Sequence, residues 1–257
     1  MGDGCKLESR VIVKGRTTLG QNNEISDGAV LGGAAQHAQS QEPGGRLIIG
    51  NNNRIRENCT LHRAYANEAA TVIGDHNLIM VGAHIAHDCR VGSHCILVNN
   101  SMLAGHVTVD DRAYVSGGVG VHQFCRIGKL AIVGALARVV QDVPPYVTVE
   151  GGGMSQIVGL NKVGLRRASY TAAEVMQLKA AYRVIYRQGL RWSEVLQILK
   201  TEFNTGPAAE FYEFLKTGKR GFVQERRISR KATLKIAPVS GTDDDVGEAS
   251  KKNREAA

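Results

Sequence analysis

A branched aliphatic residue recurs at every sixth position over the N-terminal half of the chain. The uninterrupted part of this frame is Ile73, Ile79, Ile85, Val91, Leu97, Leu103, Val109, Val115, Val121, Ile127, Val133 and Val139. The earlier part is Leu7, Val13, Leu19, Ile25, Leu31, Ile49, Ile55 and Leu61, with breaks at His37, Pro43 and Asn67. A period of six fits neither a helix nor a simple strand. It predicts a left-handed parallel β-helix of hexapeptide repeats, in which each unit forms one side of a three-sided coil.

Small side chains usually follow four positions after each aliphatic residue and supply the second inward position. They are Cys59, Cys89, Cys95, Ser101, Val107, Ala113, Val119, Cys125, Ala131 and Ala137. Four of the five cysteines thus fall on small core positions, and none of them forms a CxxC pair. We therefore expect packing groups rather than metal ligands or disulfides.

In such a coil, residues 18 apart stack at the strand spacing of about 4.8 Å. This predicts one column formed by Leu31, Ile49, Asn67, Ile85, Leu103 and Val121. Residues 32–46 and 62–71 are polar and irregular, so we expect both stretches to be loops extruded from the corner beside this column.

The frame stops at Val139, and Pro144-Pro145 is expected to end the repeat because proline cannot donate to a ladder. The prediction is therefore a mainly β protein with three parts. Residues 1–148 form the β-helix, residues 149–225 form a small α-helical domain, and residues 226–257 form a disordered polar tail.

Helical periodicity begins in the second part. Thr171 and Glu174 form a capping box, and an apolar stripe follows that ends at Gly189. The stripe is Val175, Leu178, Tyr182, Ile185 and Tyr186. Ser193 is expected to cap a second helix and Pro207 to open a third.

The formal net charge of +8 is unevenly distributed. The stretch from Lys162 to Lys235 holds sixteen basic and six acidic residues. A basic module of this kind suits nucleic acid, anionic lipid or an acidic protein. Nucleic acid is disfavoured, because aromatic residues are not interleaved with the basic ones. No apolar run is long enough for a membrane span and no leader is recognisable, and the unpaired cysteines favour a reducing cytoplasm.

Four histidines cluster near the predicted column without occupying an inward position: His84, His87, His106 and His122. Imidazole titrates near neutral pH, so such a cluster can transfer protons, or it can bind a metal. Asp88 follows His87 and is able to orient its ring if the chain turns a corner there. His76 and His94 lie 18 apart on another column with no loop nearby, and we expect ordinary exposed residues.

Several segments resemble one family of hexapeptide enzymes. They are His84-Ile85-Ala86-His87-Asp88-Cys89, Ala104-Gly105-His106-Val107, Val121-His122-Gln123-Phe124-Cys125, Gln141-Asp142-Val143-Pro144-Pro145-Tyr146-Val147, Asn53-Arg54-Ile55-Arg56-Glu57, Leu61-His62-Arg63, Gly159-Leu160-Asn161 and Gly164-Leu165-Arg166-Arg167. In this order they are similar to acyl-carrier-protein-dependent UDP-N-acetylglucosamine O-acyltransferases, over roughly residues 8 to 222. A hexapeptide frame alone would indicate only a superfamily of acyltransferases.

The resemblance implies a homotrimer that makes the first committed intermediate of lipid A. It implies transfer of a hydroxyacyl chain from the phosphopantetheine thioester of acyl carrier protein to the 3-hydroxyl of UDP-N-acetylglucosamine, without a cofactor or metal. His87 would be the general base, Asp88 would orient it, and the Gly105 N–H would stabilise the oxyanion. The basic helices fit the partner independently, because acyl carrier protein is acidic.

Further roles follow from the same resemblance. His84, His106, His122 and Gln123 would hold the sugar and the pyrophosphate-linked acceptor. Asn161 and Arg167 would bind the nucleotide, and Ala135 falls at the family's acyl-length ruler.

Two departures from the family pattern are visible. The match begins inside that pattern, so we expect the family's first coils, on the order of two, to be missing. In the first loop the family usually reads Pro-Gln-Asp-Leu-Lys, whereas this chain has Ala35-Gln36-His37-Ala38-Gln39. Only Gln36 carries over as an acceptor contact, so the acceptor sugar and the level of activity stay open. The preferred acyl length and a 3-hydroxy or 3-amino acceptor are also open.

Two alternative hypotheses about the function remain. A zinc enzyme like the gamma-class carbonic anhydrases would place three of these histidines, from neighbouring subunits, around a metal with an open position. This alternative gives no role to Asp88 or to the segment from Asn161 to Arg167. A non-catalytic protein that binds acyl carrier protein or a sugar nucleotide is favoured by the altered loop.

Overall fold

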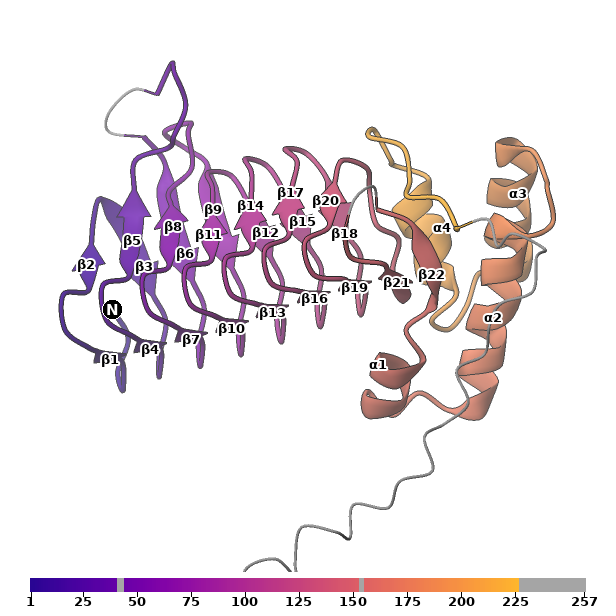
Figure 1. Ribbon diagram of the computed structural model, residues 1–257, viewed down its shortest axis with the longest axis horizontal. Helices are drawn as coiled ribbons and strands as arrows, with labels where there is room; N and C mark the ends of the chain where they lie inside the picture. Colours follow the sequence, from indigo (N-terminus) through magenta and orange to yellow (C-terminus); the bar gives the residue numbers. More distant parts are fainter. Residues whose placement is uncertain (41–43, 153–154, 227–257) are drawn as a thin grey trace, which may run out of the picture. The chain divides into compact units, whose positions relative to one another are not determined.

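The computed structural model describes residues 1–40, 44–152 and 155–226, and these build a three-sided coil followed by helices (Figure 1). Sheet A contains β1 (Lys6–Leu7), β4 (Glu24–Ile25), β7 (Arg54–Ile55), β10 (Leu78–Ile79), β13 (Ile96–Leu97), β16 (Tyr114–Val115), β19 (Ile132–Val133), β21 (Val147–Val149) and β22 (Ile157–Leu160). Sheet B contains β2 (Ile12–Val13), β5 (Val30–Gly33), β8 (Thr60–His62), β11 (His84–Ile85), β14 (Met102–Leu103), β17 (Gly120–Val121) and β20 (Arg138–Val139). Sheet C contains β3 (Arg16–Leu19), β6 (Arg46–Ile49), β9 (Ala70–Ile73), β12 (Arg90–Val91), β15 (Thr108–Val109) and β18 (Arg126–Ile127).

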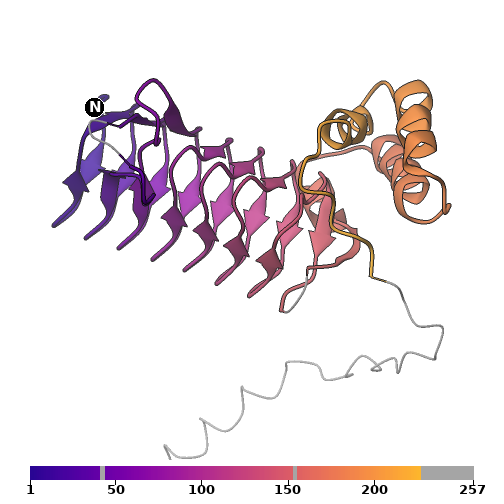
Figure 2. The same ribbon diagram turned by 90° about the horizontal axis from the view of Figure 1, so that it is seen from above.

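The six-residue frame is the inward column of these sheets. Ile85 pairs with Leu103 and Leu103 with Val121, each 18 residues further along the chain. From Leu19 onward the frame residues of the strands are buried, because three strands per coil each point one aliphatic side chain into the prism. The prediction of a left-handed parallel β-helix is confirmed. Seen from above, the coils form a regular stack (Figure 2).

The predicted column is wrong at its N-terminal end. Leu31 pairs with Leu61, not Ile49, and Leu61 pairs with Ile85. The first loop therefore lengthens its coil to 30 residues and the second loop lengthens its coil to 24. Ile49 belongs to sheet C, and Asn67 is exposed on the second loop. Both loops nevertheless leave the corner where sheet B passes to sheet C, as expected (Figure 1).

Four of the cysteines pack in the core, as predicted. Cys59, Cys89, Cys95 and Cys125 are buried and all five thiols are free. Burial raises the pKa of Cys59 to about 11 and that of Cys89 and Cys95 to about 12. These thiols therefore stay protonated at neutral pH and act as small apolar groups.

A ladder of buried asparagines fills one inward corner, which the aliphatic frame does not predict. The Asn53 N–H donates to Asn23 Oδ1 at 2.9 Å, and the Asn77 N–H donates to Asn53 Oδ1 at 2.9 Å. The Cys95 N–H then donates to Asn77 Oδ1 at 2.7 Å. Each asparagine Oδ1 thus accepts a hydrogen bond from a buried backbone N–H of the next coil, which would otherwise lack a partner.

The prolines do not end the sheet. After Pro144-Pro145, β21 still pairs in parallel with β19, with Thr148 opposite Ile132. The offset shortens from 18 to 16 residues before the prolines, because Val139 still pairs with Val121 whereas Val143 bridges to Ile127. The strand β22 then turns back antiparallel on β21 and closes sheet A.

The helices are α1 (Lys162–Arg167), α2 (Ala172–Tyr186), α3 (Trp192–Glu202) and α4 (Ala209–Leu215), and α2 and α3 lie side by side (Figures 1 and 2). The capping box that begins α2 is confirmed. The predicted cap of α3 is wrong, because Arg191 precedes the helix and Ser193 lies in its first turn. The prediction that Pro207 opens the third helix is also wrong, because α4 begins two residues later, at Ala209.

The helices share a core with the last coil. This core includes Tyr146, Leu178, Leu199 and Phe211, and Leu130 of the prism packs into it. The division of the chain at residue 148 stays a prediction. The tail predicted from residue 226 lies, from residue 227 on, outside the described residues.

Candidate active site

The B/C corner, where each coil passes from sheet B to sheet C, gathers the candidate residues. His87 and Asp88 follow β11, Gly105 and His106 follow β14, and His122 and Gln123 follow β17. The ring centroids of His87 and His106 are 5.3 Å apart. The stacking expected from the spacing of three hexads therefore holds at this corner.

His87 and Asp88 form an ion pair or hydrogen bond, with 2.8 Å between His87 Nδ1 and Asp88 Oδ2. Their side chains are 10% and 12% exposed. Asp88 is itself fixed, since Oδ2 accepts from the Tyr65 N–H and its own N–H donates to Thr71 Oγ1. A carboxylate on Nδ1 favours the tautomer in which Nε2 carries the free lone pair. His87 is therefore arranged as a base.

Gly105 lies directly against this imidazole. A Cβ on Gly105 would lie 2.6 Å from His87 Cε1 and 2.7 Å from His87 Nε2, so only glycine leaves room for the ring. Among the described residues, the Gly105 N–H donates to no acceptor. A free donor beside a base is suited to a developing oxyanion.

His84 and His62 form a second pair in the corner. The Thr60 hydroxyl lies 2.7 Å from His84 Nδ1, and the His62 and His84 ring centroids are 5.0 Å apart. Burial lowers the pKa of both rings, that of His62 to about 4. Both rings are therefore neutral at pH 7. The resemblance included the segment Leu61-His62-Arg63 but assigned a role only to His84, so the position of His62 in the site is new.

His106 and His122 are exposed at the same corner. The His106 ring stacks on Phe124 at 4.5 Å between centroids. His122 Nδ1 lies 2.9 Å from Arg220 Nη2, a residue that sequence reasoning did not connect with the site.

A groove of about 600 Å³ runs along this corner and the outer face of sheet B. Its lining includes six of the predicted residues: Gln36, His84, His87, Gly105, His122 and Gln123. His37 also lines it, with its ring centroid 5.9 Å from that of His87. His37 was noted only as a departure from the family pattern, and its position at a break in the frame was the available signal.

Asn161, Arg167 and Ala135 lie outside the groove that holds His87. Asn161 is buried, accepts from the Gly164 N–H at the start of α1, and donates to Leu130 O at the corner between sheets C and A. Arg167 is exposed at the end of α1. Ala135 follows β19 at the corner between sheets A and B.

His76 and His94, expected to be ordinary surface residues, are exposed and stack on each other at 4.9 Å. Their corner is the one between sheets C and A.

His87, Asp88 and His106 are the described residues whose geometry could hold a metal, with ligand atoms within 4.8 Å of one another. His87 Nδ1 is already engaged by Asp88, which leaves Nε2 for a metal or for a proton. Two imidazoles and a carboxylate from one chain differ from the three histidines that the zinc alternative requires.

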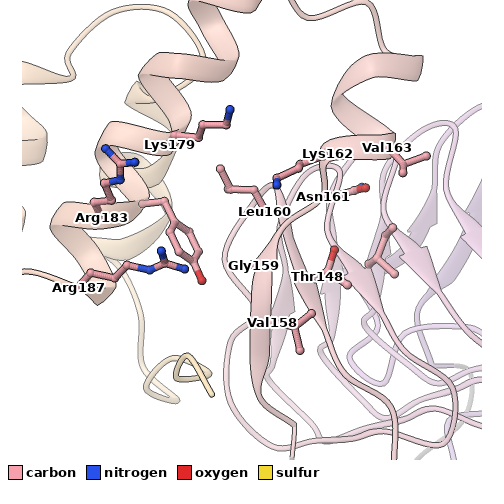
Figure 3. A pocket seen from close by; sticks show the side chains of 12 residues that line it. Thr148, Val158, Gly159, Leu160, Asn161, Lys162, Val163, Lys179, Arg183 and Arg187 are labelled. Carbon is pink, nitrogen blue, oxygen red and sulfur yellow. The ribbon is translucent and has the colours of Figure 1, made fainter. Parts of the chain in front are cut away.

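A second groove of about 680 Å³ lies between β22 and α2 (Figure 3). Ile132, Val158 and Leu160 contribute apolar surface to it. Its cations are Lys162, Lys179, Arg183 and Arg187. Arg187 is paired with Glu225 at 2.6 Å, whereas no acidic partner lies against the other three within the described chain.

The coil and its histidine-lined groove define a hexapeptide-repeat transferase. Residues 70–105 match the family model for bacterial transferase hexapeptide repeats, and residues 142–223 match the model for domain 2 of UDP N-acetylglucosamine O-acyltransferase. The structure is similar to that of the UDP-N-acetylglucosamine acyltransferase of Francisella novicida, with a TM-score of 0.84 and 38% identity over 88% of this chain and 83% of that one.

Comparison of sequences identifies relatives with the same enzyme activity in their names. The acyl-[acyl-carrier-protein]–UDP-N-acetylglucosamine O-acyltransferase of Gloeothece citriformis is 40% identical over 216 residues, which cover 82% of this chain and 78% of the relative. The enzyme of the same name from Verminephrobacter eiseniae is 46% identical over 73% of this chain and 72% of the relative. The chain belongs to the family of acyl-[acyl-carrier-protein]–UDP-N-acetylglucosamine O-acyltransferases.

Proposed function

We propose that the chain transfers a 3-hydroxyacyl group from acyl carrier protein to the 3-hydroxyl of UDP-N-acetylglucosamine, the first step of lipid A biosynthesis. The observation that carries this proposal is the His87–Asp88 pair against the free N–H of Gly105 inside one groove. A base and an oxyanion donor on adjacent coils are the two groups that acyl transfer to a hydroxyl requires.

The mechanism balances without another reactant. His87 Nε2 takes the proton of the acceptor hydroxyl as its oxygen attacks the thioester carbonyl, and Asp88 stabilises the imidazolium that forms. The Gly105 N–H donates to the oxyanion of the tetrahedral intermediate. Collapse of this intermediate breaks the carbon–sulfur bond, and the leaving thiolate takes the proton back from His87. The new bond is an ester, and no cofactor or metal takes part.

The remaining groove residues fit acceptor binding. Gln36, His84, His122 and Gln123 line the same groove and offer polar groups to the sugar and pyrophosphate. His106 adjoins His87 at the edge of this group. His37 presents an imidazole where the family pattern has a carboxylate. Its Nδ1 accepts from the Gln39 N–H, which leaves Nε2–H as a donor for the acceptor substrate.

The second groove supports acyl carrier protein as the partner. Lys179 and Arg183 are one helical turn apart on α2, and Lys162 lies on the other side of the same groove, which also has an apolar lining (Figure 3). A cationic rim of this kind attracts an acidic protein and accelerates the encounter.

A homotrimer would gather the proposed substrate residues. The groove lies at the B/C corner, Asn161 bonds to the C/A corner, and Ala135 lies at the A/B corner. One prism presents these three edges in different directions, whereas parallel prisms around a threefold axis bring different edges of neighbouring chains together. Asn161 and Arg167 would then bind the nucleotide, and Ala135 would limit the acyl chain, in the groove of a neighbour.

We propose that the chain acts in the cytoplasm, because its free cysteines suit a reducing compartment. Within the described residues, no helix combines the length and apolar character needed to cross a bilayer.

The test is to incubate purified protein with UDP-N-acetylglucosamine and a panel of acyl carrier protein thioesters and to weigh the products. We expect one acylated sugar nucleotide whose bond mild base cleaves, as an ester requires. No product with any thioester would favour a non-catalytic binding protein. Stoichiometric zinc together with activity lost to a chelator would contradict the mechanism.

His87→Ala provides the residue-level test. We expect acyl transfer to be abolished while oligomer and sugar-nucleotide binding are retained, because only the base is removed. Turnover within about tenfold of the parent would show that another group is the base. Binding of UDP-N-acetylglucosamine measured by calorimetry checks that the groove is intact.

A further inference from the structure

The segment after α4 returns to the prism and ends beside the active-site groove. Phe222 forms a parallel bridge with Asp142, the Asp142 N–H donates to Gly221 O, and the Val223 N–H donates to Asp142 O. Asp142 is buried and paired with Arg126 at 2.7 Å. This anchoring fixes the position of Arg220, which immediately precedes the bridge.

Arg220 reaches the groove through two contacts. Its Nη2 lies 2.9 Å from His122 Nδ1 and 3.4 Å from Val140 O. His122 and Val140 both line the groove that holds His87. Arg220 and His122 are 98 residues apart in the sequence, so only the docking of the C-terminal segment brings them together.

This contact decides which nitrogen of His122 carries the proton. A guanidinium can only donate, so His122 Nδ1 must accept and the proton must lie on Nε2. Without Arg220, the neighbouring Gln123 O at 3.2 Å from His122 Nδ1 would favour the opposite tautomer, with the proton on Nδ1. The two tautomers present opposite hydrogen-bonding groups to a ligand.

We propose that Arg220 is a positioning residue that holds His122 in the Nε2–H tautomer, so that His122 donates a hydrogen bond to an oxygen of the bound sugar nucleotide. This inference rests on the proposed function, since it assigns the ligand of the same groove. Sugar hydroxyls and phosphoryl groups both supply acceptor oxygens of the required kind.

The first test compares Arg220→Gln with Arg220→Lys and with Lys219→Gln in the full chain. We expect Arg220→Gln to raise KM for the sugar nucleotide about tenfold with kcat within about threefold, because His122 loses its donor tautomer while His87 is untouched. Arg220→Lys keeps a group that can only donate and should retain most of the affinity. Lys219→Gln removes the adjacent exposed charge and should leave KM at the parent value.

The second test observes the tautomer directly. In the ¹⁵N spectrum of histidine-labelled full chain, His122 should show a protonated Nε2 in the parent and in Arg220→Lys, and a shift toward a protonated Nδ1 in Arg220→Gln. Assignment by His122→Gln identifies the signal. An unchanged tautomer in Arg220→Gln overturns the proposal, whether or not the protein has acyltransferase activity.

A double-mutant cycle separates positioning from general loss of structure. If Arg220 acts through His122, Arg220→Gln should add no further loss in kcat/KM to His122→Gln, whereas independent effects would multiply. Multiplied effects, or an Arg220→Gln effect equal to that of Lys219→Gln, contradict the proposal. A parent protein without any turnover contradicts the proposed function instead, and the spectra still decide the role of Arg220.

Discussion

At the residue scale, the site depends on a left-handed residue in each coil of the B/C corner. Asp88, His106 and Phe124 have φ values of 60°, 62° and 65°. Such conformations are unfavourable for residues other than glycine, and they persist here because the coils above and below fix the corner. The turn lets Asp88 reach the ring of His87, its neighbour in sequence, although adjacent side chains in a strand point to opposite faces.

Gly105→Ala tests the tight fit around the base. The added Cβ would meet the His87 ring at 2.6 Å, so the ring must move. We expect kcat to fall about a hundredfold with little change in thermal stability, because a displacement of about 1 Å is enough to disrupt proton transfer. Gly117→Ala is the comparison outside the groove, since a Cβ there would lie 3.3 Å from its nearest neighbour, Asn99 O. Equal losses in the two variants would contradict this explanation.

The neutral state of His62 predicts a pH dependence of stability. Burial lowers its pKa to about 4 from an ordinary value of 6.5, so between these pH values the unfolded chain binds the extra proton. The contribution of His62 is therefore complete above pH 6.5 and is lost as pH falls toward 4, by up to ~3 kcal/mol. His62→Gln should flatten the free energy of unfolding against pH across this window, measured by urea titration. His76→Gln, at an exposed position, should keep the parent slope.

At the element scale, two-residue strands are stable only because they belong to a continuous stack. Short strands contribute few hydrogen bonds each, so the inward column and the corner ladder provide much of the adhesion between coils. The asparagine ladder links successive coils at the corner between sheets C and A. It lies away from the groove, so it stabilises the scaffold without entering the chemistry.

Asn77→Ala tests this ladder. The substitution leaves the buried N–H of Cys95 without its acceptor and removes the bond from Asn77 Nδ2 to Gly92 O. We expect the free energy of unfolding to fall by about 1–3 kcal/mol, measured by chemical denaturation, with the kinetic constants unchanged. Asn99→Ala, at an exposed position, should cost far less.

At the scale of the whole molecule, we propose that acyl transfer and the attraction of the acidic partner take place at two different grooves. In the proposed function, the groove with His87 carries the acyl-transfer groups. The groove between β22 and α2 carries Lys162, Lys179 and Arg183, which have no acidic partner among the described residues. Long-range attraction acts over about 8 Å at physiological salt, so the proposed docking groove would guide a partner without contacting the reacting atoms.

The double variant Lys179→Gln/Arg183→Gln tests this separation. We expect KM for the acyl carrier protein thioester to rise about fivefold to tenfold and to depend less on salt, because two steering charges are lost. KM for UDP-N-acetylglucosamine should stay at the parent value. Lys200→Gln, an exposed cation on α3, is the control. A salt dependence as steep as that of the parent would place the docking surface elsewhere.

The sequence by itself determined the coil, its packing and most of the corner chemistry. The six-residue frame, the small inward cysteines and the capping box of α2 are local sequence patterns. They can therefore be recognised without the tertiary structure. The pairing of His87 with Asp88 needed only the corner geometry that the frame implies.

Only the tertiary structure decided what depends on distant segments. The loop insertions change which residues stack in the column, so that Leu31 pairs with Leu61 and not with Ile49. The contact between Arg220 and His122, and the bond from Asn161 to Leu130 O, join residues whose separation follows no repeat. A periodic pattern fixes neighbours at constant spacing, whereas insertions and the docking of the C-terminal segment are set by packing and hydrogen bonding between parts of the chain that share no local signal.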